Sequence, residues 1–223
     1  MRQPPDSLCR QLGYVFQNGD LLEQALTHRS AAGPSNERLE FLGDALLNML
    51  IAEELFRVYP LATEGELSRR RASLVSGSAL ADLASQFNLG DYLRLGAGER
   101  KSGRGCRDSI LADGLEAVFG AVYLDGGFDS CRRLVRDTYR DRILDLPASE
   151  ALKDPKTRLQ ELLQAKQRPL PTYRVVKVEG EPHTQSFTVE CRADPICTIA
   201  SGNSRRKAEQ RAASEALQRM IDD

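Results

Sequence analysis

The chain has 223 residues, 41% hydrophobic and 28% charged, and its 31 Lys and Arg almost balance its 32 Asp and Glu, giving a formal net charge of -1. This composition excludes a disordered chain, and the overall charge gives no sign of a nucleic-acid binder. With no apolar run of about 18 residues and no basic, apolar leader, we expect a cytoplasmic protein with no membrane partner. The five cysteines form no CxxC pair, so we expect reduced thiols and no cysteine-bound zinc.

The first part of the chain has the 3.6-residue periodicity of helices, and no convincing strand stands in it. Gly, Asn and Pro separate the periodic runs. The expected helices include Asn36–Val58, Glu64–Phe87, Ser109–Leu124 and Asp129–Ile143. An all-α domain is therefore expected at residues 1–146.

After a turn-rich stretch at 145–150, the pattern changes to β-branched, alternating segments between two helices. We expect the helix Asp154–Gln167, the strands Thr172–Val178, Ser186–Cys191 and Ile196–Ala200, and a helix from Ser204 to about Met220. This α-β-β-β-α order predicts a small α+β domain at 154–223, after a linker at 147–153, with both helices on one face of an antiparallel sheet. The fold class is thus multidomain.

The two parts also differ in charge. Lys153–Asp223 carries 13 Lys and Arg against 10 Asp and Glu, whereas residues 1–152 carry 18 against 22. The first part is therefore acidic and the second basic.

Three acids share one face of the first long helix. At about 100° per residue, Glu37, Glu40 and Asp44 fall within roughly a 60° arc, which by itself is typical of a solvated acidic stripe. Leu47 and Ile51 continue the same line, so the helix becomes hydrophobic all round, as buried helices do. We therefore expect the three carboxylates at the rim of a packed core.

A second acid pair lies in the apolar run Ser109–Leu124, whose only charged residues are Asp113 and Glu116. Small residues at Gly114, Ala117 and Gly120 would let another helix approach closely. If the two acidic helices pack together, repulsion between carboxylates raises their pKa values and a divalent cation relieves it. Oxygen ligands without nearby His or Cys favour Mg²⁺, with Mn²⁺ as a substitute; neutralisation by Arg side chains is the alternative.

Three other features leave alternatives open. Glu64 follows a capping-box threonine, so it is either a first-turn acid or a functional one. The basic, Gly-rich segment Gly96–Arg107 is either a phosphate-contacting loop or an ordinary flexible loop. His28 and His183 stand in different parts of the chain, which disfavours a nuclease with two histidines in one site and makes His28 a structural residue.

The basic second part offers three candidate contacts to a duplex. Three cations at the start of a helix oppose the helix dipole, which makes sense if phosphate binds there. A polar face on the preceding helix and the loop at Glu179–His183 suit the shallow minor grooves of A-form RNA. The candidate RNA-binding residues are Thr157, Gln160, Glu161, Gln164, His183, Arg205, Arg206 and Lys207.

These residues together resemble the bacterial ribonuclease III family. The run Asn36–Asp44 (NERLEFLGD) resembles its signature, and Asp113-x-x-Glu116-Ala its second acidic motif. Leu26–Ser30, Lys101–Gly103 and the α-β-β-β-α segment are similar to its flanking segments and its double-stranded-RNA-binding domain. The resemblance covers nearly the whole chain in the same order.

The resemblance implies a homodimeric endoribonuclease that hydrolyses phosphodiester bonds in double-stranded RNA, leaving 5′-phosphate and 3′-hydroxyl ends. By position, Glu40, Asp113 and Glu116 would bind Mg²⁺, and Asp44 and Glu116 would be catalytic, with Asp44 ordering water. Glu37 and Glu64 would lie nearer the RNA or a second metal position. No small-molecule cofactor is implied, and ribosomal RNA precursors and other structured transcripts are the expected substrates.

The second domain departs from the family pattern at two places. Gly180–His183 replaces the Gly-Pro-x-His loop found in many such modules, and Glu209 stands where many have Lys. Two other functions stay open: a non-catalytic dimer that binds duplex RNA, and an all-α Mg²⁺-dependent nucleotide pyrophosphatase. Crowded carboxylates speak against the first, and a duplex-binding domain speaks against the second.

Overall fold

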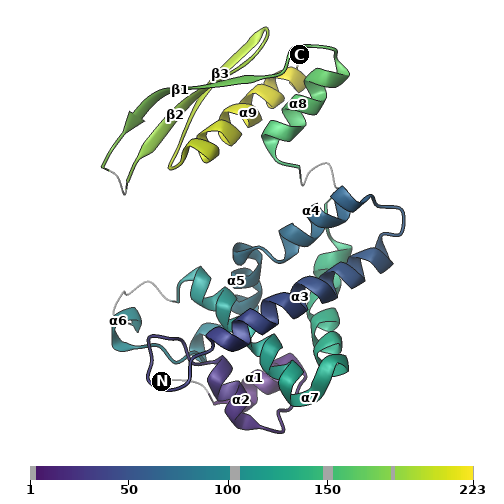
Figure 1. The fold of residues 1–223 in the computed structure, drawn as a ribbon, viewed down its shortest axis with the longest axis vertical. Helices are drawn as coiled ribbons and strands as arrows, with labels where there is room; N and C mark the ends of the chain where they lie inside the picture. The colour runs from purple at the N-terminus through teal and green to yellow at the C-terminus, as the bar shows by residue number, and fades with distance from the viewer. Residues whose placement is uncertain (1–3, 101–105, 148–152, 182–183, 223) are drawn as a thin grey trace. The chain divides into compact units, whose positions relative to one another are not determined.

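The computed structural model describes residues 4–100, 106–147, 153–181 and 184–222, without the side chains of Arg100, Ile221 and Asp222. The chain forms two compact units, Met1–Leu146 and Pro147–Asp223 (Figure 1). No helix in the described ranges is long and apolar enough to cross a membrane.

The first unit is helical, with one isolated β-bridge between Thr27 and Arg94 among its described residues. Thr63 and Glu66 form the predicted capping box. The expectation of one helix over 64–87 is wrong, because Ser76 accepts a hydrogen bond from the backbone N–H of Ala79 and so begins a new helix. The helices are α1 (Pro5–Leu12), α2 (Gly19–Ala25), α3 (Glu37–Val58), α4 (Glu64–Leu74), α5 (Gly77–Gln86), η1 (Leu89–Asp91), α6 (Ala97–Arg100) and α7 (Asp108–Leu144).

Helix α7 is bent at Gly127, whose φ of 78° and ψ of -179° are not helical. Glycine populates this conformation at little cost, whereas residues with a Cβ rarely adopt it. The two halves of α7 on either side of the bend correspond to the predicted helices 109–124 and 129–143.

Helices α3 and α7 form the centre of the first unit and approach so closely that their backbones touch at two glycines. A Cβ on Gly43 would lie 1.8 Å from the carbonyl oxygen of Glu116, and one on Gly120 would lie 2.3 Å from that of Leu39. The predicted role of Gly120 in close helix packing is confirmed, and Gly43 is its counterpart on α3.

Leu47 and Ile51 are fully buried, as predicted, but α3 is not hydrophobic core all round. Phe41, Met49 and Phe56 are 80%, 52% and 75% exposed. These three follow one another at intervals of eight and seven residues, so they lie on the same side of α3. The other described residues of the first unit thus leave an apolar face of α3 uncovered.

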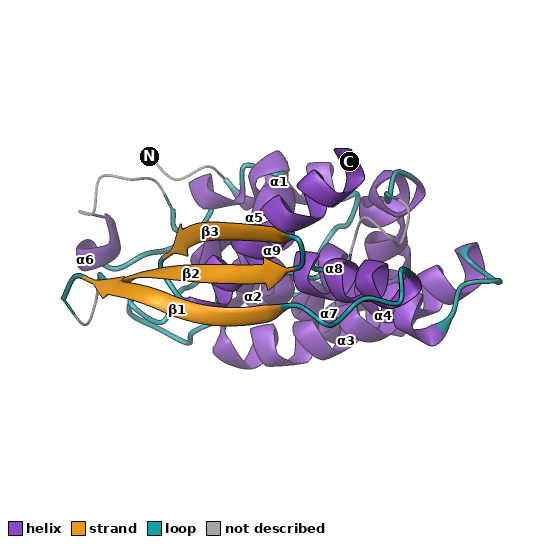
Figure 2. Cartoon of the chain, turned by 90° about the horizontal axis from the view of Figure 1, so that it is seen from above, coloured by secondary structure: helices purple, strands orange, loops and turns teal. Residues whose placement is uncertain are grey.

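The second unit has the predicted α-β-β-β-α order, and its antiparallel sheet has β2 in the centre (Figure 2). Its elements are α8 (Pro155–Ala165), β1 (Thr172–Glu179), β2 (Ser186–Ala193), β3 (Ile196–Gly202) and α9 (Arg205–Asp222). Leu159 and Leu163 of α8 pack with Ala212 and Ala216 of α9 against Cys191 of the sheet. Both helices therefore cover one sheet face, as expected.

Candidate functional site

Three acids converge where α3 crosses the first half of α7. Glu40 comes from α3, and Asp113 and Glu116 come from consecutive turns of α7. Each offers a carboxylate oxygen, and the three oxygens all lie within 4.8 Å of one another. The contact at Gly43 and Gly120 makes this convergence possible, because it allows the two helix backbones to meet beside the acids.

The surroundings of the three acids disfavour their ionised forms. The pKa of Glu116 is raised to about 7, chiefly by burial and then by the negative charges of Asp44, Glu40 and Asp113. Burial is also the main cause that raises the pKa of Glu40, followed by the charge of Asp113. Repulsion therefore acts in the predicted direction, but burial is the larger cause.

Cationic side chains act on Asp113 and Glu40. Burial raises the pKa of Asp113, while the charges of His28 and Arg29 lower it, and Arg29 also lowers the pKa of Glu40. Arg29 itself pairs with Glu37 at 3.7 Å, and within the described ranges no Lys or Arg forms a salt bridge with Glu40, Asp113 or Glu116. An all-oxygen, partly buried site without a paired cation fits a hard divalent ion such as Mg²⁺ or Mn²⁺.

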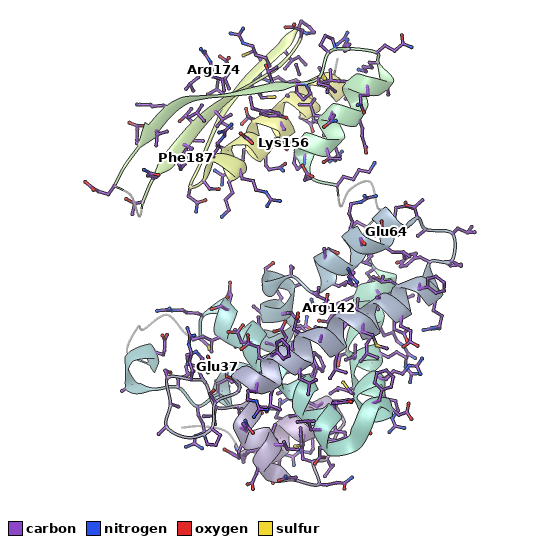
Figure 3. The ribbon with its side chains drawn as sticks, in the orientation of Figure 1. Glu37, Glu64, Arg142, Lys156, Arg174 and Phe187 are labelled. Carbon is purple, nitrogen blue, oxygen red and sulfur yellow. The ribbon has the colours of Figure 1, made fainter. Side chains whose placement is uncertain are left out.

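The other predicted acids lie outside this trio. Asp44 is exposed one turn beyond Glu40, and its Oδ1 accepts a hydrogen bond from Asn48 Nδ2 at 2.9 Å. Glu37 accepts a hydrogen bond from Ser35 at 2.9 Å. Glu64 begins α4 and accepts one from Ser68, and Figure 3 places it at the opposite end of α3 from Glu37. Within one chain Glu64 is thus remote from the acid cluster.

A pocket of about 440 Å³ opens beside the cluster, and it includes residues that sequence reasoning did not select. Asn36 is buried, and its Nδ2 has no hydrogen-bond partner among the described residues, so a donor is left for a ligand. Arg29 and Arg107 bring positive charge to the pocket. The position of Asn36 at the start of the nine-residue motif is the one signal that could have identified it.

His28 has the predicted structural role and also lines this pocket. Its Nδ1 lies 2.8 Å from Ser30 Oγ, which in turn accepts a hydrogen bond from the backbone N–H of Gly96. Of the predicted basic loop, residues 101–105 lie outside the described residues. Arg107 lies 3.6 Å from Glu99.

In the second unit, two of the three candidate contact regions are described. Arg206 and Lys207 are exposed at the first turn of α9, whereas His183 lies outside the described residues. The hydroxyl of Thr157 donates to the N-cap residue Asp154 at 2.8 Å. The exposed face of α8 presents Thr157, Gln160, Glu161 and Gln164.

Glu209 neutralises part of the basic surface. One of its carboxylate oxygens accepts a hydrogen bond from Lys156 at 2.7 Å, and the other accepts one from Arg205 at 2.8 Å. The ammonium of Lys156 also stands 4.4 Å from the ring centre of Tyr173. Arg205 is therefore already paired, whereas the side chains of Arg206 and Lys207 form no ion pair with another described residue.

Two family models match the chain: "Ribonuclease-III-like" over residues 18–143 and "Double-stranded RNA binding motif" over residues 155–220. "Ribonuclease 3" of Alkalilimnicola ehrlichii is 55% identical over 224 aligned residues, covering 100% of this chain and 98% of the relative. "Ribonuclease 3" of Nitrosococcus oceani is 58% identical over 217 residues, covering 95% and 93%.

Solved structures agree with these matches for the first unit. The nuclease domain of ribonuclease III from Campylobacter jejuni is 37% identical with a TM-score of 0.60, covering 64% of this chain and 97% of that domain. A second structure of that domain, described as concerning a region involved in dimer formation, is 39% identical with a TM-score of 0.58, covering 61% and 99%.

Proposed function

This chain belongs to the ribonuclease III family, and we propose that it hydrolyses phosphodiester bonds in double-stranded RNA with Glu40, Asp113 and Glu116 as the centre of its active site. The observation that carries this proposal is the convergence of these three carboxylates, within 4.8 Å and without a paired cation in the described ranges. The same chain carries a double-stranded-RNA-binding motif that can hold the substrate.

Glu40, Asp113 and Glu116 would hold Mg²⁺, or Mn²⁺ in its place, through one oxygen each. When bound, such an ion lowers the pKa of water and offsets negative charge on the phosphate. Asp44 would orient the attacking water: Asn48 fixes one of its oxygens at 2.9 Å, which leaves the other to accept a hydrogen bond. The expected products carry 5′-phosphate and 3′-hydroxyl ends.

The second unit would bind the duplex by its shape. The polar face of α8 faces the minor groove, and Arg206 and Lys207 contact phosphates at the start of α9, where free backbone N–H groups add to the attraction. His183, whose position in the sequence lies between β1 and β2, stays a candidate. We assign residues 1–146 to the nuclease domain, 147–153 to the linker and 154–223 to the RNA-binding domain.

We further propose that a second copy of the chain covers the exposed apolar face of α3. Phe41, Met49 and Phe56 leave an apolar row on a helix that also carries the active-site acid Glu40. Burying such a row between two copies is favourable, and a two-fold symmetric contact would bring two acid clusters to one duplex. Glu37 and Glu64 would then lie toward the RNA or a second metal position.

The natural substrates and location are proposed from the family alone. They are ribosomal RNA precursors and other structured transcripts in the cytoplasm.

Replacing Glu116 by Gln tests the proposed centre. The protein and this variant are incubated with labelled duplex RNA, single-stranded RNA and nucleoside triphosphates, with Mg²⁺ or with chelator. We expect the wild type to cut duplex RNA only with Mg²⁺, and Glu116→Gln to cut it about 100-fold more slowly or worse, with duplex affinity in chelator unchanged.

The control is Glu215→Gln, which changes an exposed acid of α9 in the same way. Equal loss of duplex binding and cleavage in Glu116→Gln would contradict the assigned role. Hydrolysis of nucleoside triphosphates instead of RNA would favour a pyrophosphatase.

A further inference from the structure

A second charged groove lies outside the active site, where the end of α3 meets the second half of α7. Its volume is about 690 Å³. Five arginines and two acids line it, although residues 1–152 as a whole carry more acids than cations. The lining residues are Glu54, Arg57, Asp129, Arg132, Arg133, Arg136 and Arg140.

The four arginines of α7 face outward because the opposite side of α7 is packed into the core. Cys131, Val135 and Tyr139 are fully buried. Arg132, Arg136 and Arg140 are exposed and repeat every fourth residue, so they form a row with a step of about 6 Å along the helix. The fold thus presents a line of positive charge.

Two of the five arginines are held by neighbouring acids of α3. Arg57 pairs with Glu54, and Arg132 pairs with Glu53. These ion pairs neutralise the wall of the groove that α3 forms.

The other three arginines form only weak interactions, or none, with other described residues. Arg133 reaches only Ser130 Oγ, at 3.4 Å, and Arg136 lies 3.5 Å from its exposed neighbour Asp137. Arg140 has no hydrogen bond or ion pair with another described residue. Exposed contacts of this kind contribute little stability, so folding does not account for these three arginines.

We propose that this groove, here called the α7 arginine groove, binds the phosphate backbone of RNA beyond the stretch that lies over the active site. Guanidinium groups match phosphate oxygens with two parallel hydrogen bonds. A row of cations with no apolar anchor between them suits a repeating anion better than a folded acidic protein. This inference rests on the proposed function, since it assumes that the chain holds duplex RNA.

The test compares the full-length protein with Arg133→Ala/Arg140→Ala, because neither side chain forms an ion pair in the described structure. Binding is measured in chelator, so that no cleavage occurs, at several salt concentrations. One duplex has about 16 base pairs, the span of one RNA-binding module, and the other has roughly 40. Arg10→Ala, on the exposed side of α1, is the control.

For the long duplex, we expect the double variant to bind about tenfold more weakly and its slope of log affinity against log salt to be shallower by about 1 to 2. Affinity for the short duplex should not change, and Tm should stay within about 2 °C of wild type. Arg133→Lys/Arg140→Lys should keep the salt slope but lose part of the affinity, since lysine lacks the planar fork.

Equal salt slopes for wild type and double variant on the long duplex would overturn the inference. The inference would also be overturned if the double variant bound RNA as wild type does but no longer bound a polyglutamate probe. That result would indicate that the groove binds an acidic protein. Failure of wild type to bind the short duplex would instead refute the proposed function itself.

Discussion

Replacing Gly43 by Ala tests whether the close crossing of α3 and α7 builds the acid cluster. The added methyl group would lie 1.8 Å from the carbonyl oxygen of Glu116 and 3.2 Å from the backbone nitrogen of Gly120. Ordinary contact begins at 3.4 Å, so the backbones must separate by roughly 1.6 Å, and neither atom is on a flexible side chain.

This displacement acts directly on a proposed metal ligand, because the clashing carbonyl belongs to Glu116. Mg²⁺ requires six oxygens at about 2.0–2.1 Å in near-octahedral geometry, and a site displaced by more than about 0.5 Å loses that geometry. Overpacking of this kind lowers the free energy of unfolding by about 1–3 kcal/mol. For a domain of this size, each kcal/mol lowers Tm by about 2–4 °C.

Thermal unfolding with and without Mg²⁺, together with duplex cleavage, measures both consequences. Wild type should gain Tm on adding Mg²⁺, because an ion that binds only the folded state stabilises it. Gly43→Ala should have a lower Tm without Mg²⁺, gain little Tm on adding it, and cleave at least about tenfold more slowly. Gly77→Ala is the control, since a Cβ there meets nothing within 4 Å. If Gly43→Ala keeps the wild-type Tm, the wild-type response to Mg²⁺ and the wild-type cleavage rate, the close crossing does not build the acid cluster.

Three further variants or conditions give separate expectations. The pKa of Glu116 is about 7 in the folded chain against an ordinary 4.5, so between these pH values the folded chain without metal holds a proton that the unfolded chain has lost. The stability that this proton contributes is fully present below about pH 4.5 and is lost as pH rises through about 7. In chelator, Tm should therefore fall over that window. Mg²⁺ or Glu116→Gln should reduce the fall, and an identical pH profile for wild type and Glu116→Gln would contradict the assignment. Glu209→Gln should free Arg205 and Lys156 for phosphate, tightening duplex binding and steepening the salt slope by about 0.9 per cation; weaker binding would show that Glu209 mainly positions the helices. Phe41→Ser should weaken self-association in sedimentation experiments with little change in monomer stability, whereas Val15→Ser, at another exposed apolar position, should not; equal effects would argue against the α3 face as the interface.

Local sequence pattern was a good guide to the elements and a poorer one to their boundaries. The α-β-β-β-α order is visible from periodicity because each element is short and its apolar side faces one core. The sequence does not show the break between α4 and α5, because the periodic pattern continues across it. A single cap at Ser76 decides that boundary.

Exposed apolar residues show a second limit of pattern reading. The sequence predicts that α3 becomes hydrophobic all round, yet Phe41, Met49 and Phe56 of this helix are each more than half exposed. Periodicity reports that a face is apolar, and it cannot report whether the same chain covers that face.

Charge pairing was not visible in the sequence either. The α7 arginine groove joins Arg57 to residues more than seventy positions later, and Glu209 joins α9 to Lys156 of α8. Such contacts depend on which helices become neighbours. The same composition read along the chain gives only a list of solvated charges.

Helical spacing alone predicts which acids face the same way, since residues three or four apart on a helix share a face. The residue counts also show that an acidic and a basic part cancel to a net charge of -1. The meeting of Glu40 with Asp113 and Glu116 depends on how α3 and α7 pack, and so does the larger effect of burial than of repulsion on the pKa of Glu116. Spacing fixes a direction around a helix, but the distance between two helices depends on what fits at their crossing.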